Sequence, residues 1–548
     1  MLSRIKTSVL LSIVCFALVL SACGNSNDST ASPSGNKGDS ASQTAASKPE
    51  AEAGQTELVR IAWSDSGYPS PFAFSPTGPG GFLHNSFLFD TLTWKDASGI
   101  IPWLAKSWSI SEDGLSYTFK LESGVKWHDG QSFTAEDVVF SFNYYKTHPF
   151  NWTGDIEQIE SVTKMGEDSV VFKLKNKYAP FLSDLVGIVP IIPKHVWEHV
   201  DKPVEYRASD ALVGTGPYTL KEYDEKSGQY LFEANPDYFK GKVKVKEIQY
   251  LNAANKALAL QNDEIDGGLT MSYPEVEDLQ KQGFESIKSE PTGSALRITF
   301  NLEHPQLGDK RLRQAITYAL DRSEMASKLT GGEPMVGNAG IIPPDSPWYN
   351  PSVKQYEYNP DKANQMLDEL GYAKNAAGIR ETLKLNVMVS STSQEALIMQ
   401  EMLKKVGVQL NIQQVDPAAF TAAMGENKYD MAITGHIGLS GDPDYLRLWF
   451  LGEASNAYAA RGKTWNNSDF QKLAIEQMQE LDPDKRKELV GKMQDILADE
   501  LPTLVLYHRP FYYMYNPKVY NGWSNTYGGI ADGIPLWDNK VFLIDAKK

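Results

Sequence analysis

The chain has few residues of the kinds that carry covalent or metal chemistry. Its two cysteines, Cys15 and Cys23, both lie near the N-terminus, so the rest of the chain has no thiol for a disulfide, a nucleophile or a metal. Among its eight histidines, His195 and His199 are spaced four apart. They lack an HExxH motif and an obvious third ligand, and we interpret them as surface or hydrogen-bonded histidines. We therefore expect no metal site and no cofactor.

Enzyme motifs are also missing from the sequence. Residues 461–464 resemble the end of a phosphate-binding loop, but Ala457 stands where that loop needs a glycine. Residues 438–441 lack the glycine spacing of a nucleophile elbow. We predict that no residue is catalytic. A hydrolase tethered to the cell surface is the alternative from another class, and it requires a nucleophile beside a base.

The sequence has no excess of basic residues, and its one long apolar run lies at the N-terminus. The formal net charge is −16, which argues against binding to nucleic acid. Residues 9–20 are apolar except for Ser12, follow Arg4 and Lys6, and lead to the sequence LSAC, which ends at Cys23. This order is typical of a secretory signal, and small residues before a cysteine resemble the bacterial lipobox.

The N-terminal segments predict a protein tethered to a membrane. We expect residues 1–22 to be a lipoprotein signal peptide and Cys23 to carry the lipid anchor; an ordinary signal peptide with a chance cysteine is the alternative. Residues 23–56 are mostly small and polar. Such a segment cannot bury enough apolar surface to fold, so we predict a disordered linker. The body would then lie at the extracytoplasmic face of the cell membrane.

The rest of the chain, from residue 57 on, is too long for one ordinary hydrophobic core. We predict a first lobe, rich in strands, over residues 57–290 and a second lobe over residues 291–500. Residues 501–548 have strand character again and many aromatic side chains. We expect this last segment to return to the first lobe.

The pattern of the second lobe is that of an α/β fold. Residues 383–389 and 408–412 alternate between apolar and polar, which predicts strands. A helix between them is predicted to start at Thr392, with Glu395 completing a capping box. A further helix is expected after Asp416, where proline takes the first position. Strands separated by single helices predict a parallel sheet that is covered on both faces.

A histidine beside an aspartate, in the stretch WHDGQSFTAEDVVF from Trp127 on, resembles a catalytic pair at first sight. The tryptophan is predicted to end a short strand, and the Asp-Gly pair that follows is a turn dipeptide. Thr134 is predicted to cap a helix, with Asp137 at its third position. These tasks are structural, and the local sequence offers no third catalytic group. We predict a structural role for the stretch and no chemistry for His128.

Several motifs along the chain occur in the order of a known family. They are PWLAKSW (102–108), DGLSYTF (113–119), GVKWHDG (124–130), TAEDV (134–138), GTGPY (214–218), NPDY (235–238), RQAI (313–316), NPDKA (359–363) and DPD (442–444). With these motifs the chain closely resembles the extracellular peptide/nickel-binding proteins of ABC importers, solute-binding family five, over about residues 57 to 510.

The resemblance implies an α/β fold of the large type II periplasmic-binding-protein class. Such proteins have two lobes with mixed sheets flanked by helices, a hinged cleft between the lobes, and an extra subdomain in the first lobe, here roughly residues 82–210. The resemblance further implies a monomeric surface lipoprotein of a Gram-positive-type cell. It would capture a solute, pass it to a membrane permease driven by ATPase subunits, and catalyse nothing.

Candidate ligand contacts follow from the resemblance at residues 435–444. Peptide-binding members of the family often carry a Gly-Trp pair and, shortly after it, an aspartate that pairs with the amino terminus of the peptide. Here His436 takes the place of the tryptophan, and Leu439 takes the place of the aspartate. Because a buried ammonium without a counter-charge is costly, Asp442 or Asp444 would have to substitute if the loop is shifted. The alternative is a turn that serves only the scaffold.

Aromatic side chains add three further candidates for the ligand site. Tyr68, Trp465 and Tyr527 are predicted to line the crevice, with ordinary core packing as the alternative for each. Aromatic faces stack equally well on peptide side chains and sugar rings. A peptide is our first choice of ligand, and an oligosaccharide or a nickel or other metal chelate is the alternative. A signalling receptor without a transporter is a further possibility.

Overall fold

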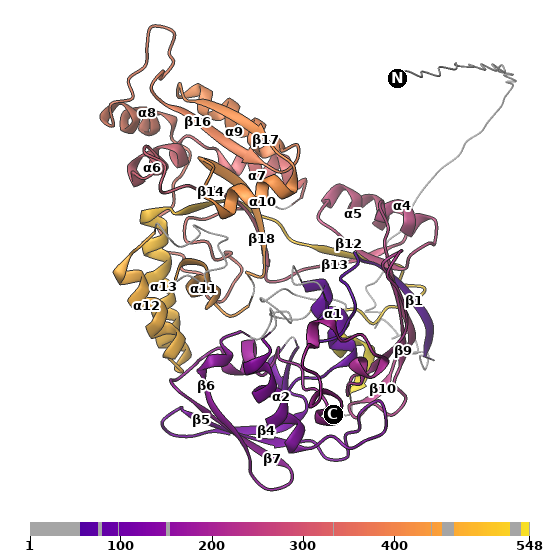
Figure 1. Ribbon diagram of the computed structural model, residues 1–548. Coiled ribbons are helices and arrows are strands. Elements are labelled where there is room, and N and C mark those ends of the chain that lie inside the picture. Colours follow the sequence, from indigo (N-terminus) through magenta and orange to yellow (C-terminus); the bar gives the residue numbers. More distant parts are fainter. Residues whose placement is uncertain are drawn as a thin grey trace, which may run out of the picture. The chain divides into compact units, whose positions relative to one another are not determined.

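The computed structural model describes residues 55–74, 79–96, 98–149, 154–332, 334–439, 441–451, 465–525 and 539–546 (Figure 1). The predicted signal peptide, Cys23, nearly all of the predicted linker, and Tyr527 lie outside the described residues.

Among the described residues, helices separate most strands after residue 251, whereas most strands before it follow one another without an α-helix between them. In chain order, the strands are β1 (Thr56–Ala62), β2 (Thr93–Asp96), β3 (Gly99–Pro102), β4 (Ala105–Ile110), β5 (Ser116–Leu121), β6 (Ile159–Lys164), β7 (Ser169–Leu174), β8 (Tyr218–Asp224), β9 (Gln229–Ala234), β10 (Gly241–Val243), β11 (Val245–Leu251), β12 (Gly267–Thr270), β13 (Glu285–Lys288), β14 (Ser294–Phe300), β15 (Met335–Val336), β16 (Lys384–Val389), β17 (Gln409–Gln414), β18 (Met431–Ile437), β19 (Thr503–His508), β20 (Tyr512–Tyr515) and β21 (Ile544–Ala546).

The helices mostly follow or separate these strands. The α-helices are α1 (Pro79–Leu88), α2 (Ala135–Thr147), α3 (Lys194–Trp197), α4 (Lys256–Gln261), α5 (Tyr273–Gln280), α6 (Lys310–Tyr318), α7 (Arg322–Thr330), α8 (Pro360–Glu369), α9 (Gln394–Lys405), α10 (Pro417–Gly425), α11 (Tyr445–Phe450), α12 (Ser468–Gln479) and α13 (Pro483–Glu500). Short turns of other helix types are η1 (Ile156–Gln158), η2 (Phe181–Leu185), η3 (Pro203–Glu205), η4 (Ser209–Leu212) and η5 (Lys540–Leu543).

The first lobe is built on a seven-stranded mixed sheet in the order β13-β20-β12-β1-β11-β9-β8. Strand β1 pairs in parallel with β11 and β12, whereas the outer strands pair antiparallel. Helices α4 and α5 pack against β12 (Figure 1). The central strands are therefore protected by neighbours on both sides, and the hydrophobic core gathers around β1, β9 and β11.

The second lobe is built on a six-stranded mixed sheet in the order β15-β19-β14-β18-β16-β17. Strand β16 pairs in parallel with both β17 and β18, which confirms the parallel arrangement predicted from the alternating strands and helices. The cap of α9 is Ser393 rather than the predicted Thr392, because the Ser393 hydroxyl accepts the hydrogen bond from the Ala396 backbone N–H at 3.2 Å. The predicted cap of α10 is confirmed at Asp416.

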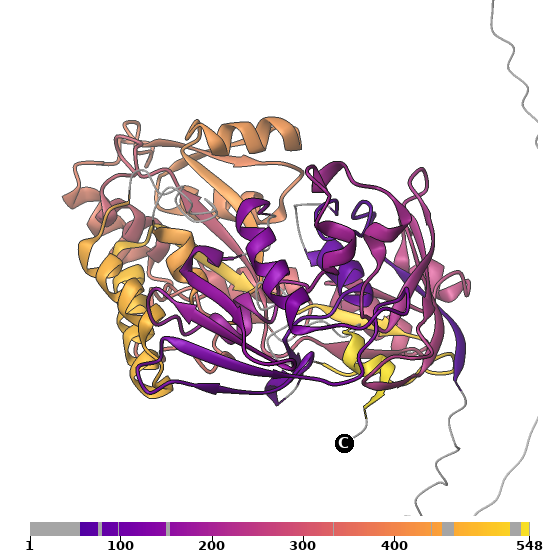
Figure 2. The ribbon, with the colours of Figure 1, turned by 60° about the horizontal axis from the view of Figure 1, so that its bottom comes forward.

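A four-stranded antiparallel sheet, β4-β5-β7-β6, is inserted between β1 and β8 of the first sheet. Helix α2 packs across β6 and β7 (Figure 2). On β5, the buried residues are Tyr117, Phe119 and Leu121, as the alternation in the sequence predicts. We call the chain from β2 to η4, residues 93–212, the inserted part of the first lobe.

Two short stretches connect the sheets of the two lobes. The first, residues 289–293, runs from β13 to β14, and the second, residues 509–511, runs from β19 to β20. They are held together because the Ser289 backbone N–H donates to the Phe511 carbonyl oxygen at 2.9 Å, and the Phe511 backbone N–H donates to the Ser289 hydroxyl at 2.9 Å. Two crossing connections side by side form a natural hinge.

The return of the chain to the first lobe begins later than residue 501. Strand β19 pairs antiparallel with β14 and β15, so it belongs to the second sheet. Strand β20 is the first element to rejoin the first sheet, between β12 and β13. The apolar pattern of β19 fits a central strand of either sheet, which is why the sequence alone misplaces it.

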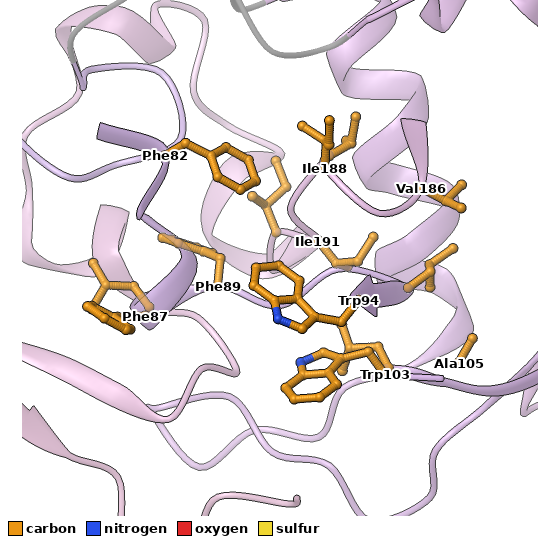
Figure 3. Packing of buried hydrophobic residues seen from close by; sticks show 14 of the residues in the cluster. Phe82, Phe87, Phe89, Trp94, Trp103, Ala105, Val186, Ile188 and Ile191 are labelled. Atoms are coloured by element: carbon orange, nitrogen blue, oxygen red, sulfur yellow. The ribbon is translucent and has the colours of Figure 1, made fainter. Parts of the chain in front are cut away.

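The C-terminal segment is anchored inside the first lobe by buried polar contacts. Figure 3 shows the indoles of Trp94 and Trp103 side by side in the core, with ring centroids 5.9 Å apart. The Trp94 indole N–H donates to the Asn539 side chain at 2.8 Å. The Lys540 ammonium lies 4.0 Å from the centre of the Trp94 ring and donates to the Asp90 carboxylate at 2.7 Å.

Three of the family motifs converge on this buried carboxylate. Trp103 of PWLAKSW donates its indole N–H to Asp90 at 2.6 Å, Thr215 of GTGPY donates its hydroxyl at 2.8 Å, and Tyr238 of NPDY donates its hydroxyl at 3.0 Å. The side chains of Asp90 and Lys540 are 0% exposed. A buried charge requires such a full set of partners, so these motifs describe the scaffold of the first lobe.

Candidate functional site

The candidate site of the second lobe lies where β14 and β18 pair next to α11. Across these strands Ala295 faces His436, and Arg297 faces Thr434. The guanidinium carbon of Arg297 lies 4.8 Å from the centre of the Trp449 ring, and the His436 ring meets the same indole edge-on at 4.2 Å. A buried guanidinium supported on an indole is a strong anion-binding group, because its donors match a carboxylate in pairs.

His436 is neutral in this environment. Burial lowers its pKa well below the ordinary value, and the positive charge of Arg297 lowers the pKa further. The residue before it, Gly435, is exposed. A neutral imidazole next to a permanent cation supplies one donor and one acceptor without adding charge. The group formed by Arg297, His436 and Trp449, which we call the Arg297 group, thus combines a permanent cation with a neutral imidazole and an indole.

Leu439 and Trp465, two predicted ligand contacts, lie in an apolar cluster of the second lobe. Leu439 is 1% exposed and Trp465 is 8% exposed. The Trp465 ring packs edge-on against Phe450 and Phe470, with centroids 5.2 and 4.9 Å away. Most of the surface of both side chains is therefore covered by the protein itself.

Asp442 forms a double ion pair with a residue of α13. Its two carboxylate oxygens accept hydrogen bonds from both terminal nitrogens of Arg486, at 2.7 and 2.5 Å. The Arg486 guanidinium also donates to the side chain of Gln477 at 3.1 Å. Both partners of the ion pair are nearly buried, with side-chain exposures of 11% for Asp442 and 7% for Arg486. The charge of the Asp442 carboxylate is therefore already balanced by Arg486 within the second lobe.

Asp444 is held in the same way by a residue one turn further along the chain. The Nε atom of Arg447 donates to Asp444 at 2.9 Å, and its Nη2 atom donates at 2.6 Å. The Gln477 side-chain amide adds a third donor at 2.6 Å. Burial raises the pKa of Asp444, while its hydrogen bond to Arg447 opposes that rise. Neither predicted aspartate thus presents an uncompensated carboxylate for an ammonium group.

Tyr68 lies in the first lobe, apart from the other predicted residues. Its hydroxyl donates to the Ala208 carbonyl oxygen at 3.3 Å, and the guanidinium carbon of Arg207 lies 5.4 Å from its ring centre. It lines a hollow of about 330 Å³ together with His128, Tyr223 and neighbouring residues. The structure therefore gives Tyr68 an exposed edge but no contact with the Arg297 group.

His128 has a structural task that the sequence did not reveal. The Gly214 backbone N–H donates to its Nδ1 atom at 3.2 Å, and its Nε2 atom lies 3.0 Å from the Gly216 carbonyl oxygen. Nε2 therefore carries the proton, and the ring is neutral; burial accordingly lowers its pKa. The adjacent Asp129 carboxylate pairs with His195, 2.8 Å away, instead of with His128.

The rest of this stretch fits its prediction except at its start. The Thr134 backbone N–H and hydroxyl both donate to the Asp137 carboxylate, at 2.8 and 2.9 Å, which confirms the capping box. Trp127 does not end a strand; only Lys126 and Ser132 form an isolated bridge. The Trp127 backbone N–H donates to the Gln131 carbonyl oxygen at 2.8 Å, and the Phe133 backbone N–H donates to the Val125 carbonyl oxygen at 3.0 Å, so the two arms pair around this bridge without a longer ladder.

Two absences hold for the described part of the chain. No group of three or more histidine, cysteine, aspartate or glutamate side chains in it is arranged to hold a metal ion. No helix in it has the length and apolar character needed to cross a bilayer.

Sequence reasoning missed Arg297, Arg447 and Arg486, the cations that organise this part of the second lobe. Arg297 offered a signal, because it is the only charged residue in the otherwise apolar or neutral strand β14. Arg447 is the only charged residue of the short helix α11, whereas Arg486 lies among many other charged residues on α13. The i, i+3 spacing of Asp444 and Arg447 is visible in the sequence, whereas the pairing of Arg486 with Asp442 is fixed by tertiary packing.

Comparisons with known proteins agree on one family. The profile of the bacterial extracellular solute-binding proteins, family 5 (middle), matches residues 99–458. The oligopeptide-binding protein AppA of Bacillus subtilis (strain 168) is 29% identical over 556 residues, which cover 95% of this chain and 97% of that protein.

Solved structures give the same result for the fold. The ABC transporter substrate-binding protein CtaP of Listeria monocytogenes matches with a TM-score of 0.75 and 25% identity, over 90% of this chain and 100% of that chain. NikZ of Campylobacter jejuni, solved in complex with Ni(L-His), matches with a TM-score of 0.74 and 23% identity, over 89% of this chain and 99% of that chain.

Proposed function

Because the chain belongs to family 5 of the bacterial extracellular solute-binding proteins, we propose that it captures peptides between its two lobes for an ABC importer. The observation that carries the peptide assignment is the match to an oligopeptide-binding protein across nearly the full length of both chains. The closed lobes would be recognised by a membrane permease, and separate ATPase subunits would drive uptake. The binding protein itself would catalyse nothing.

The Arg297 group supports a ligand with a carboxylate. A guanidinium recognises a carboxylate with two parallel hydrogen bonds, and every linear peptide carries one at its C-terminus. A neutral oligosaccharide offers no such group. A chelate of a metal with an amino acid does offer one, and the structural match to a nickel–histidine-binding protein favours that chelate as the second candidate.

Binding measurements on the purified protein distinguish these ligands. We expect peptides to raise the thermal unfolding midpoint, because a ligand that binds only the folded state stabilises it. Calorimetric titration with peptides of increasing length, an oligosaccharide and nickel–histidine gives the affinity for each. If every peptide fails while the chelate or the sugar binds, the peptide assignment is wrong. Recovery of the bound peptide with its mass unchanged tests the absence of catalysis.

A variant pair tests the role of the Arg297 group. Arg297→Met keeps the side-chain volume and removes the charge, so we expect at least a tenfold loss of affinity. Arg297→Lys keeps the charge and should retain part of the affinity. Arg311→Met is the matched control, because Arg311 is exposed and, among the described residues, forms its ion pair with Asp309 at the start of its own helix. Equal affinity in all three variants would exclude a ligand role for Arg297.

The location and the oligomeric state follow from the same proposal. We propose that Cys23 carries a lipid that holds the protein to the outer face of the cell membrane, and that the protein is a monomer. Cys23→Ala should release the protein from the membrane fraction, whereas Cys15→Ala should leave it bound. Light scattering during gel filtration gives the mass, and a dimer would contradict the monomer.

A further inference from the structure

Asp442 and Asp444 each hold an arginine beside a contact between the two lobes. The Nη2 group of Arg447 donates hydrogen bonds both to Asp444 and to Asp155 of the inserted part. Asp155 lies 292 residues earlier in the chain. The side chains of Arg447 and Asp155 are 12% and 28% exposed. One guanidinium therefore bridges a carboxylate of each lobe.

The surrounding contacts make this bridge rigid on the side of the second lobe. Gln477 donates to Asp444 at 2.6 Å and accepts from Arg486 at 3.1 Å. Arg486 in turn holds Asp442 through two hydrogen bonds. A second contact across the lobes lies beside the bridge, because the Ala179 backbone N–H donates to the Met478 carbonyl oxygen at 2.7 Å.

The charges of this network do not balance. It contains three cations and four carboxylates, which are Lys95, Arg447, Arg486, Asp155, Asp184, Asp442 and Asp444. Asp184 of the inserted part is the carboxylate with the weakest pairing, because its one ion pair, to Lys95, is 3.7 Å long. Asp442 and Asp444 act on it from the opposite lobe with like charge. Closure therefore brings attraction at Asp155 and repulsion at Asp184.

We propose that the Asp155–Arg447 ion pair is a latch between the lobes, and that Asp184 opposes it. The latch would favour the closed arrangement before any solute binds, and so raise the fraction of protein that is ready to hold a ligand. The use of the latch in uptake rests on the proposed function. The latch itself is a property of the free protein and can be measured without a ligand.

Protonation of Asp184 removes its negative charge and so weakens its repulsion from Asp442 and Asp444. Burial is the main cause that raises the pKa of Asp184 to about 7; Lys95 lowers it, and Asp442 and Asp444 raise it. The other groups that face it are Arg486 and the phenol of Tyr178. Because Asp442 and Asp444, which raise this pKa, lie on the opposite lobe, closure adds to the rise, and acid favours the closed arrangement.

The test measures the distance between the lobes in the free, full-length chain. Fluorescent labels are placed at Thr163→Cys on β6 and Glu401→Cys on α9, two exposed positions, after Cys15 and Cys23 have been replaced by serine. We expect Asp155→Asn to lower the ratio of closed to open protein roughly three- to tenfold, as for a partly exposed ion pair. The measured distance then shifts toward longer values.

Two further variants make the result decisive. Glu157→Gln is the matched control, because Glu157 lies two residues from Asp155 but pairs at 3.7 Å with Lys175 of the inserted part. Its distance distribution should equal that of the unaltered chain. Asp184→Asn removes the repulsion and should shift the distance in the opposite direction. If Asp155→Asn and Asp184→Asn both retain the unaltered distances while remaining folded, the latch does not exist, whatever solute the protein binds.

Discussion

Two ion pairs in this protein join distant parts of the chain, and they differ in their access to water. The pair of Asp90 and Lys540 is fully enclosed in the first lobe, and its carboxylate has four donors. The pair of Asp155 and Arg447 lies between the lobes and keeps part of its surface exposed. An enclosed pair resists opening, because separating it leaves buried charges, whereas a hydrated pair can open and close at small expense in free energy.

The enclosed pair should give the largest effect on removal of one partner. Lys540→Met leaves the Asp90 carboxylate buried without its cation, which should lower the free energy of unfolding by about 3–5 kcal/mol. Thermal or urea unfolding measures this loss. Lys328→Met, which removes a cation from an exposed helical pair with Glu324, should cost about 0.5 kcal/mol or less. Equal losses in both variants would mean that burial of the Asp90–Lys540 pair does not affect the free energy of unfolding.

A smaller loss of stability is expected when Asp444, which holds Arg447 within the second lobe, is replaced. Asp444→Asn removes one carboxylate from the buried side of Arg447, but Asp155 and the amide of Gln477 keep the neighbouring groups paired. We expect a decrease of roughly 1–3 kcal/mol in the free energy of unfolding, from the weakened hydrogen bonds to charged groups. The same unfolding measurement checks it. If the free energy of unfolding falls further than in Lys540→Met, the enclosed Asp90–Lys540 pair is not the more stabilising of the two.

The smallest loss of stability is expected at the latch itself. Asp155→Asn removes a partly exposed charge and leaves Arg447 paired with Asp444, so the free energy of unfolding should fall by about 1 kcal/mol or less. The affinity for the ligand should fall in proportion to the closed fraction, because only the closed protein retains the ligand. Unfolding and calorimetric titration on one sample separate these two effects. A large loss of stability with unchanged affinity would identify Asp155 as a scaffold residue.

The sequence predicted the features that depend on neighbouring residues. The caps at Thr134 and Asp416 and the alternation in β5 follow from local spacing, and the structure confirms them. The parallel pairing of β16 with β17 and β18 follows from the order of strands and helices. These features are fixed within a few turns of chain, where period and capping chemistry determine the outcome.

The remaining features depend on partners far along the chain. Strand β19 joins the second sheet rather than the first, and nothing in its own residues distinguishes the two. The pairing of Asp442 with Arg486 depends on a helix that follows 44 residues later, whereas the pairing of Asp444 with Arg447 lies within one turn of chain. Motif residues such as Thr215 identify the family, but only the structure shows that they meet at Asp90.

The dependence of lobe closure on pH tests the account most directly. Burial raises the pKa of Asp184 to about 7, and Asp442 and Asp444 of the opposite lobe contribute to that rise, so the ratio of closed to open protein should fall between pH 6 and pH 8. Asp184→Asn should abolish this dependence and hold the labels at the distance that the unaltered chain shows in acid. An identical pH profile in both proteins, or a ratio that rises with pH in the unaltered chain, would contradict the account.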